Sequence, residues 1–223
     1  MVAPESSFRV RCPGFRADGG RHTLLLHSCC APCVSSALET LAETFDMTLY
    51  YYNPNIHPEA EYLRRLSELR RFAAAFPPAR GAALVEADYE PADFYRATNA
   101  LSEPDMQAEP ERGTRCSRCY RFRLEQAFRY AAAVGFAFVA TTLSASPYKD
   151  ARAINAAGQA LEAQFRAAAD GAYPRFLAAD FKKRDGYARS LELSREYGLY
   201  RQRYCGCVYS VARAPKVCGK PGA

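Results

Sequence analysis

An apolar run that stops abruptly at three cysteines constrains this sequence more than any other stretch. The run His22–His27 contains three successive leucines, as expected of a strand buried on both faces of a parallel sheet. Residues 28–32 turn the chain, and apolar side chains recur at helical spacing over residues 33–45. A second apolar segment follows over residues 47–52. This order predicts a right-handed crossover between two parallel strands.

Alternating strand and helix patterns continue along the chain. Further strands are predicted over residues 82–87, 136–141 and 173–177, and helices over 58–76, 91–100, 116–134, 151–169 and 185–197. The helix over 151–169 is expected to break near Gly158, and residues 101–115 and 142–150 are expected to be loops. The pattern predicts one Rossmann-like α/β domain over residues 21–210, in which helices flank a mostly parallel sheet. Residues 1–20 and 211–223 are interpreted as a loose lead-in and a loose tail.

Polar motifs follow three of the predicted strands at their carboxyl ends. Cysteines follow the first strand, Asn53 follows the second, and a polar segment with Ser144, Ser146 and Lys149 follows the strand over 136–141. Ligands of open parallel sheets bind beyond the carboxyl ends of the strands. We therefore expect these motifs, and a metal site, at one edge of the sheet.

Seven of the nine cysteines fall into three groups: Cys29, Cys30 and Cys33; Cys116 and Cys119; Cys205 and Cys207. This number exceeds the four ligands of a structural zinc site. It suits a four-thiolate iron–sulfur cluster, with three thiols left for chemistry or for a second metal. Adjacent cysteines are expected to serve one ion poorly, which favours two neighbouring metal centres. Cys12 and Cys218 stand alone and are interpreted as inert thiols.

Other interpretations of the cysteines remain open. Cys30 and Cys33 have the spacing of a thiol–disulfide oxidoreductase between a strand and a helix. The groups also fit a zinc-stabilised RNA-binding module without catalysis, and any one pair fits a buried, inert thiol pair. His27 ends the first strand and is interpreted either as a thiol partner or as a satisfied core histidine.

Composition and charge narrow the class of protein. The 223 residues are 49% hydrophobic and 24% charged, which describes a globular chain rather than a disordered one. No apolar segment approaches the about 20 residues of a membrane span, and no secretion signal is recognised. We therefore expect a cytoplasmic protein without a membrane partner, in a compartment where clustered cysteines favour metal binding or redox chemistry. The absence of a glycine-rich phosphate loop argues against a nucleotide cofactor.

A net charge of +6 is compatible with a polyanionic partner, although an ordinary solvated surface explains it equally well. The helix after Cys116 carries a predicted basic face that could meet RNA phosphates, made of Arg118, Arg121, Arg123 and Arg129.

Five long motifs together resemble the QueH family of epoxyqueuosine reductases: LLLHSCCAPC, YYNPNIHPEAEYLRR, RCSRCYRFRLE, TTLSASPYK and DFKKRDGYARSLELSREYGLYRQRYCGCVYS. The resemblance covers roughly residues 22–210. It implies the last step of queuosine biosynthesis, in which the epoxide of epoxyqueuosine is reduced at the tRNA wobble position. It also implies a [4Fe–4S] cluster with one additional iron beside it, and no cobalamin.

Carried over residue by residue, the family's thiols correspond to the seven grouped cysteines. Cys29 and Cys30 are the expected catalytic thiols. Beyond what the resemblance implies, we expect Asp180 or another carboxylate to be a further ligand of the second iron. The expected partners are a tRNA that carries epoxyqueuosine in its anticodon loop and an unidentified electron donor. The candidate groups for substrate contact or proton delivery, which also fit a polar loop with a helix cap, are Asn53, Ser144, Ser146, Lys149, Lys182, Lys183 and Asp185.

Overall fold

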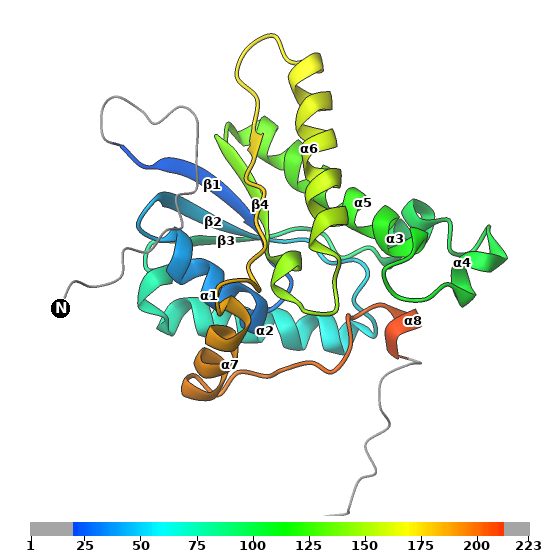
Figure 1. Ribbon diagram of the computed structural model, residues 1–223, viewed down its shortest axis with the longest axis horizontal. Helices are drawn as coiled ribbons and strands as arrows, with labels where there is room; N and C mark the ends of the chain where they lie inside the picture. Colours follow the sequence, from blue (N-terminus) through cyan, green and yellow to red (C-terminus); the bar gives the residue numbers. More distant parts are fainter. Residues whose placement is uncertain (1–19, 212–223) are drawn as a thin grey trace, which may run out of the picture.

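Five parallel strands form a single sheet in the computed structural model, which describes residues 20–211 of the chain (Figure 1). Cys12 and Cys218 lie outside these residues. The strand order is β3–β2–β1–β4–β5, so β1 lies in the centre between β2 and β4. The strands are β1 (His22–His27), β2 (Phe45–Tyr51), β3 (Ala83–Glu86), β4 (Phe138–Thr141) and β5 (Arg175–Phe176). The prediction of an α/β fold with a parallel sheet is confirmed.

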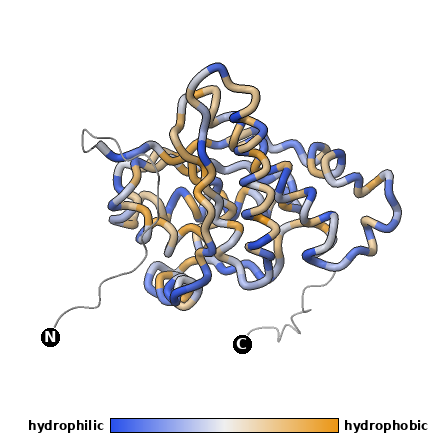
Figure 2. Tube along the Cα trace, turned by 45° about the horizontal axis from the view of Figure 1, so that its top comes forward, coloured by the Kyte–Doolittle hydropathy of each residue, from blue (hydrophilic) through white to orange (hydrophobic). Residues whose placement is uncertain are grey.

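Helices cover both faces of this sheet (Figure 1). They are α1 (Ala31–Leu41), α2 (Glu59–Ala75), α3 (Pro91–Thr98), α4 (Pro104–Ala108), α5 (Thr114–Val134), α6 (Ala151–Ala168), α7 (Gly186–Glu196) and α8 (Val208–Val211), with short 3-10 helices η1 (Pro77–Ala79) and η2 (Thr142–Ala145). Figure 2 shows hydrophobic residues along the central strands and more hydrophilic residues on the outlying helices and loops.

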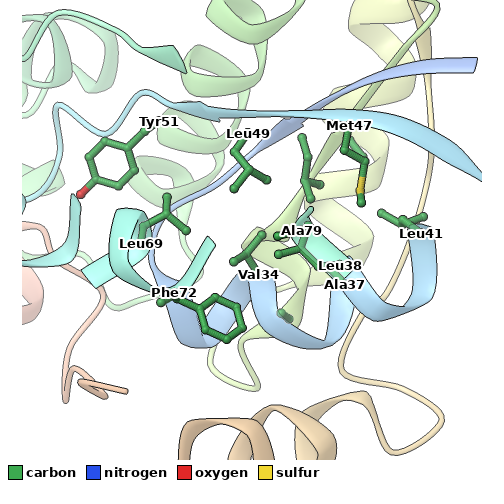
Figure 3. Close-up of a cluster of buried hydrophobic side chains, with 14 of the residues drawn as sticks. Val34, Ala37, Leu38, Leu41, Met47, Leu49, Tyr51, Leu69, Phe72 and Ala79 are labelled. Atoms are coloured by element: carbon green, nitrogen blue, oxygen red, sulfur yellow. The ribbon is translucent and has the colours of Figure 1, made fainter. Parts of the chain in front are cut away.

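The central strand explains why the sheet is buried on both sides. Leu24 and Leu26 belong to the core formed with α1, α2 and α7, while Leu25 belongs to the core formed with α5 and α6. Side chains alternate between the two faces of a strand, so an uninterrupted leucine run fills both cores. Figure 3 shows the first core, where Val34 and Leu38 of α1 meet Leu49 of β2.

The sheet has a topological switch point between β1 and β4. The chain leaves β1 into α1 on one face, whereas it leaves β4 through η2 into α6 on the other. The loops therefore diverge beyond the carboxyl ends of these strands and leave a crevice, the usual ligand position in such sheets.

Several predicted boundaries are wrong. α1 begins at Ala31 and ends at Leu41, and Phe45 belongs to β2. The predicted loop over 101–115 contains α4 and the start of α5, and the predicted loop over 142–150 begins with η2. Pro104 occupies the first turn of α4, where its missing N–H breaks no helical hydrogen bond.

Gly158 does not interrupt α6, which is continuous over Ala151–Ala168. A Cβ at this position would overlap the ring of Phe176 in β5. The glycine therefore permits close packing of the helix on the strand and does not mark a break.

Candidate metal and substrate site

Three thiols converge immediately beyond β1, and we call them the strand-end thiols: Cys29, Cys30 and Cys33. Cys30 is the N-cap of α1, and Cys33 lies in the first helical turn. The sulfur atoms all lie within 4.8 Å of one another, with 3.8 Å between Cys29 Sγ and Cys30 Sγ. Tetrahedral ligands with metal–sulfur bonds of about 2.3 Å stand about 3.8 Å apart. These distances contradict the expectation that adjacent cysteines serve one ion poorly.

Four more thiols come together from two distant segments, and we call them the helix-loop thiols: Cys116, Cys119, Cys205 and Cys207. Cys116 lies in the first turn of α5, and Cys205 and Cys207 precede and adjoin α8. Cys119 and Cys207 pack together against Phe94 of α3. Burial raises the pKa of Cys119 to about 11, and the neighbouring charge of Cys205 adds to this rise. The fold therefore joins the two later cysteine pairs predicted from the sequence.

A cavity of about 730 Å³ connects the two groups of thiols. Cys29 and Cys33 line it from one group, and Cys116, Cys205 and Cys207 line it from the other. Its walls also carry groups that the sequence did not single out, among them Glu111, Tyr120, Tyr148, Tyr187, Arg201, Gln202, Arg203 and Tyr204. The cavity is large enough for a small organic ligand and is lined by thiols together with aromatic and charged side chains.

Lys149 lies between the two groups of thiols. Its Nζ is 3.2 Å from Cys205 Sγ, and its side chain lines the cavity. Burial opposes its charge, but the thiolates of Cys205 and Cys29 outweigh burial and raise the pKa of Lys149 above its ordinary value. Ser146, also predicted from the sequence, lines the same cavity.

The neighbours of two thiols lower the pKa of those thiols. Hydrogen bonds from Cys30 and Cys33 lower the pKa of Cys29 well below its ordinary value, against burial and with help from Lys149 and Arg123. A hydrogen bond from Cys207 likewise lowers the pKa of Cys205, again against burial and with help from Lys149. Thiolates are the metal-binding form of cysteine.

The other predicted substrate residues are not among the residues that line the cavity in the described part of the chain. Asn53 is buried and donates to the Ser28 carbonyl oxygen over 3.0 Å, while Ser144 accepts from the Phe181 amide over 3.4 Å. Asp180 pairs with Lys182, with 2.6 Å between Oδ1 and Nζ. Lys183 and Asp185 are exposed. Their predicted roles in the site stay predictions.

His27 is a satisfied core histidine. Its Nδ1 lies 2.8 Å from Thr141 Oγ1, and its Nε2 lies 3.1 Å from the Tyr52 carbonyl oxygen. Burial, with the charge of Arg123, lowers the pKa of His27 to about 3, so the ring is neutral. It joins β1 to β4. A satisfied core histidine was one of the two interpretations made from the sequence.

The predicted basic face of α5 is wrong in part. Arg123 is 1% exposed and bonds Asn53 Oδ1, so it cannot meet RNA. Arg118 is paired with Glu103 over 2.9 Å, and Arg129 is paired with Glu125 over 2.6 Å. Helical spacing alone does not separate an exposed arginine from one buried against a polar partner.

Arg65 supports the cysteine loop and was missed from the sequence. It is 1% exposed and donates to the carbonyl oxygens of Cys205, over 3.0 Å, and Tyr204, over 3.3 Å. Its position three residues after Tyr62 and four before Leu69 places it on the apolar face of α2, and this spacing could have identified it. Gly206 helps to fix the same loop. Its φ is +121°, and its carbonyl oxygen accepts a hydrogen bond from the His57 amide.

These residues fit a metal centre. The donors are soft thiols, which select iron–sulfur clusters, zinc and related ions. Among residues 20–211, the strand-end thiols have the spacing that a single ion requires. Within the same part of the chain, no helix combines the length and apolar character of a membrane span.

Comparisons with known proteins place the site in a family context. A family model described as epoxyqueuosine reductase QueH matches residues 24–213. A protein named epoxyqueuosine reductase QueH from Staphylococcus epidermidis is 38% identical over 198 residues, covering 88% of this chain and 79% of the relative. Proteins of the same name from Streptococcus pyogenes and Haemophilus influenzae are each 39% identical, covering 85% and 88% of this chain and 71% and 75% of the relatives.

Proposed function

The chain belongs to the QueH family of epoxyqueuosine reductases, and from this premise we propose that it reduces the epoxide of epoxyqueuosine at the wobble position of tRNA. Membership makes the chain an oxidoreductase and implies the last step of queuosine biosynthesis. Both C–O bonds of the epoxide break, an alkene forms, and the oxygen leaves as water. The conversion consumes two electrons from an external donor and two protons. The observation that carries this proposal is the convergence of two groups of thiols on one cavity, which five of the seven grouped cysteines line.

The two groups of thiols suit two metal centres. The strand-end thiols lie within 4.8 Å of one another, so these three residues would hold a single iron. The helix-loop thiols suit a [4Fe–4S] cluster, since each of its four irons takes its own thiolate. The cluster supplies single electrons when bound, and the additional iron supplies a Lewis acid for the epoxide oxygen.

The chain's own residues bind and orient the substrate. Lys149 Nζ, between the thiol groups, donates a hydrogen bond to the epoxide oxygen and stabilises it electrostatically as the C–O bonds break. Tyr148, Tyr187 and Tyr204 line the cavity and offer ring faces on which a splayed base can stack. Asn53 contributes indirectly, because it holds the Ser28 carbonyl oxygen at the base of the thiol turn.

The anticodon loop of a tRNA is the proposed macromolecular partner. Arg201 and Arg203 line the cavity and are positioned to meet phosphates beside a base that enters it. Contacts between arginine and phosphate release counterions, so affinity should fall steeply as salt increases. Binding of the tRNA that is indifferent to salt concentration would contradict this electrostatic interface.

A thiol–disulfide oxidoreductase based on Cys30 and Cys33 is less compatible with the site. Burial raises the pKa of Cys30 to about 12, and the Cys30 side chain is 1% exposed. An attacking thiol of that class needs a low pKa and access to its substrate. Activity that survives complete removal of metal would nevertheless favour this alternative.

Activity on a defined RNA tests the proposal directly. Iron- and sulfide-reconstituted protein should convert an anticodon stem-loop with epoxyqueuosine into a product that lacks one oxygen, under anaerobic conditions with a chemical reductant. The Cys33→Ser variant should lose this activity, because it removes one thiol of the compact group. Inactive wild-type protein with full iron content, or a colourless protein that retains stoichiometric zinc, would refute the proposed reaction and favour an RNA-binding module.

A further inference from the structure

Arg123 is a buried cation without a carboxylate partner. Its side chain is 1% exposed and hydrogen-bonds Asn53 Oδ1, which in turn is fixed through Nδ2 to the Ser28 carbonyl oxygen. The Nε atom of Arg123 is buried and has no hydrogen-bond partner in the described part of the chain. No Asp or Glu of residues 20–211 forms an ion pair with it.

Such an arrangement requires a nearby anion. Burying an unpaired charge costs several kcal/mol, which is comparable to the net free energy of unfolding of a whole domain. The groups that could supply this anion are thiols, because buried Cys119 lies one helical turn before Arg123 on α5. Asn53, which Arg123 bonds, is in turn fixed to the residue before Cys29. Cys119 and Cys29 belong to two of the three cysteine segments, so Arg123 is tied to both.

Arg123 differs from Lys149, the cation beside Cys205, in its access to the cavity. Lys149 lines the cavity and is therefore open to substrate, whereas Arg123 is not among the lining residues. Solvent anions and RNA phosphates cannot reach a side chain that is 1% exposed and does not line the cavity. Arg123 is thus a permanent positive charge directed at whatever the thiolates hold.

We propose that Arg123 is a positioning residue that acts as the fixed counterion of the thiolate-bound metal centre and raises its midpoint potential. This inference rests on the proposed function, since it requires a redox-active centre on these thiols. Reduction adds one negative charge to the centre, and a nearby cation stabilises the reduced form more than the oxidised form. Charge and hydrogen bonding around the sulfur atoms are established determinants of cluster potentials.

An anaerobic redox titration, followed by absorbance and electron paramagnetic resonance, measures this effect. Full-length wild-type protein, Arg123→Gln and Arg123→Lys are reconstituted with iron and sulfide and compared at equal iron content. Glutamine can still donate to Asn53 but carries no charge, whereas lysine keeps the charge and loses the guanidinium fork. Arg129→Gln is the matched control, because Arg129 lies on the same helix with its side chain 63% exposed.

We expect a more negative midpoint potential for Arg123→Gln and wild-type potentials for Arg123→Lys and Arg129→Gln. A glutamine variant that fails to fold, beside a lysine variant that folds with the wild-type potential, also supports a requirement for charge. An unchanged potential in Arg123→Gln, an equal shift in both Arg123 variants, or misfolding of both overturns the inference. Wild-type protein that takes up no redox-active centre overturns the proposed function itself, so the two failures are distinguishable.

Discussion

Replacing Arg65 by methionine should separate the anchoring of the cysteine loop from ordinary helix stability. The guanidinium crosses from α2 to the segment before α8, where it binds two backbone carbonyl oxygens. On α2 itself its Nε is paired with Glu61 over 2.7 Å, with the side chains 1% and 11% exposed. Methionine keeps most of the side-chain volume and removes every one of these polar contacts.

The expected loss of stability follows from these contacts. Removing one partner of a buried, hydrogen-bonded ion pair costs about 3–5 kcal/mol, because the remaining groups stay desolvated. The Cys205 and Tyr204 carbonyl oxygens would each lose a hydrogen bond to a charged donor, an interaction of about 1.5–3 kcal/mol. These contributions overlap, so we expect the Arg65→Met variant to lose about 3–5 kcal/mol in the free energy of unfolding.

Urea denaturation of the reconstituted full-length protein measures this loss. Arg70→Met is the matched control on the same helix, since Arg70 is 54% exposed and its pair with Glu86 should contribute about 1 kcal/mol or less. The Arg65 variant should also bind less iron, because the loop with Cys205 and Cys207 loses its clamp. A loss below about 1 kcal/mol, equal to the control, would refute the reasoning that the buried arginine anchors this loop.

Three further substitutions test other parts of the structure. Gly206→Ala should reduce iron content and activity, because Gly206 has φ of +121° and its Cβ would lie 2.9 Å from Ile56 Cγ1; wild-type iron content would contradict this. Gly158→Ala should lower the free energy of unfolding by about 1–3 kcal/mol through overlap with the Phe176 ring, and a neutral effect on thermal denaturation would show that the helix can shift. Asp150→Ala should cost about 1 kcal/mol because Asp150 Oδ1 caps α6 through the amides of Arg152 and Ala153. That variant should keep its iron, and iron loss would mean that the cap also shapes the site.

The parallel sheet was predictable because its signal is local and strong. The leucines of β1 and the apolar segment of β4 are long enough, and sufficiently free of polar residues, to indicate strands buried on both faces. The segments α4 and η2 were not predictable, since each is about one turn long and depends on the packing around it. A glycine inside a helical pattern can either break the helix or leave room for a neighbouring side chain. At Gly158 only the position of the Phe176 ring decides between these two roles.

The site was predictable in its thiols but not in its supports. Cysteine is an uncommon residue in proteins, so clusters of it stand out in this sequence. The strand order alone places two of the motifs at the same edge of the sheet. No comparable sequence signal distinguishes Arg65 and Arg123, because arginine is abundant in this sequence and is usually exposed in proteins. Spacing within α2 can place Arg65 on an apolar face, but it cannot reveal the distant partners of these side chains, Cys205 for Arg65 and Asn53 for Arg123.

Iron and sulfide analysis of anaerobically reconstituted protein tests the central claim most directly. With two thiol groups serving two centres, wild-type protein should hold the four irons of a cluster and one further iron, together with the visible absorption of an iron–sulfur protein. Cys33→Ser should lose the further iron and keep the cluster, whereas Cys119→Ser should lose the cluster. Wild-type protein that binds four irons and never a fifth would contradict the assignment of the strand-end thiols to a separate iron.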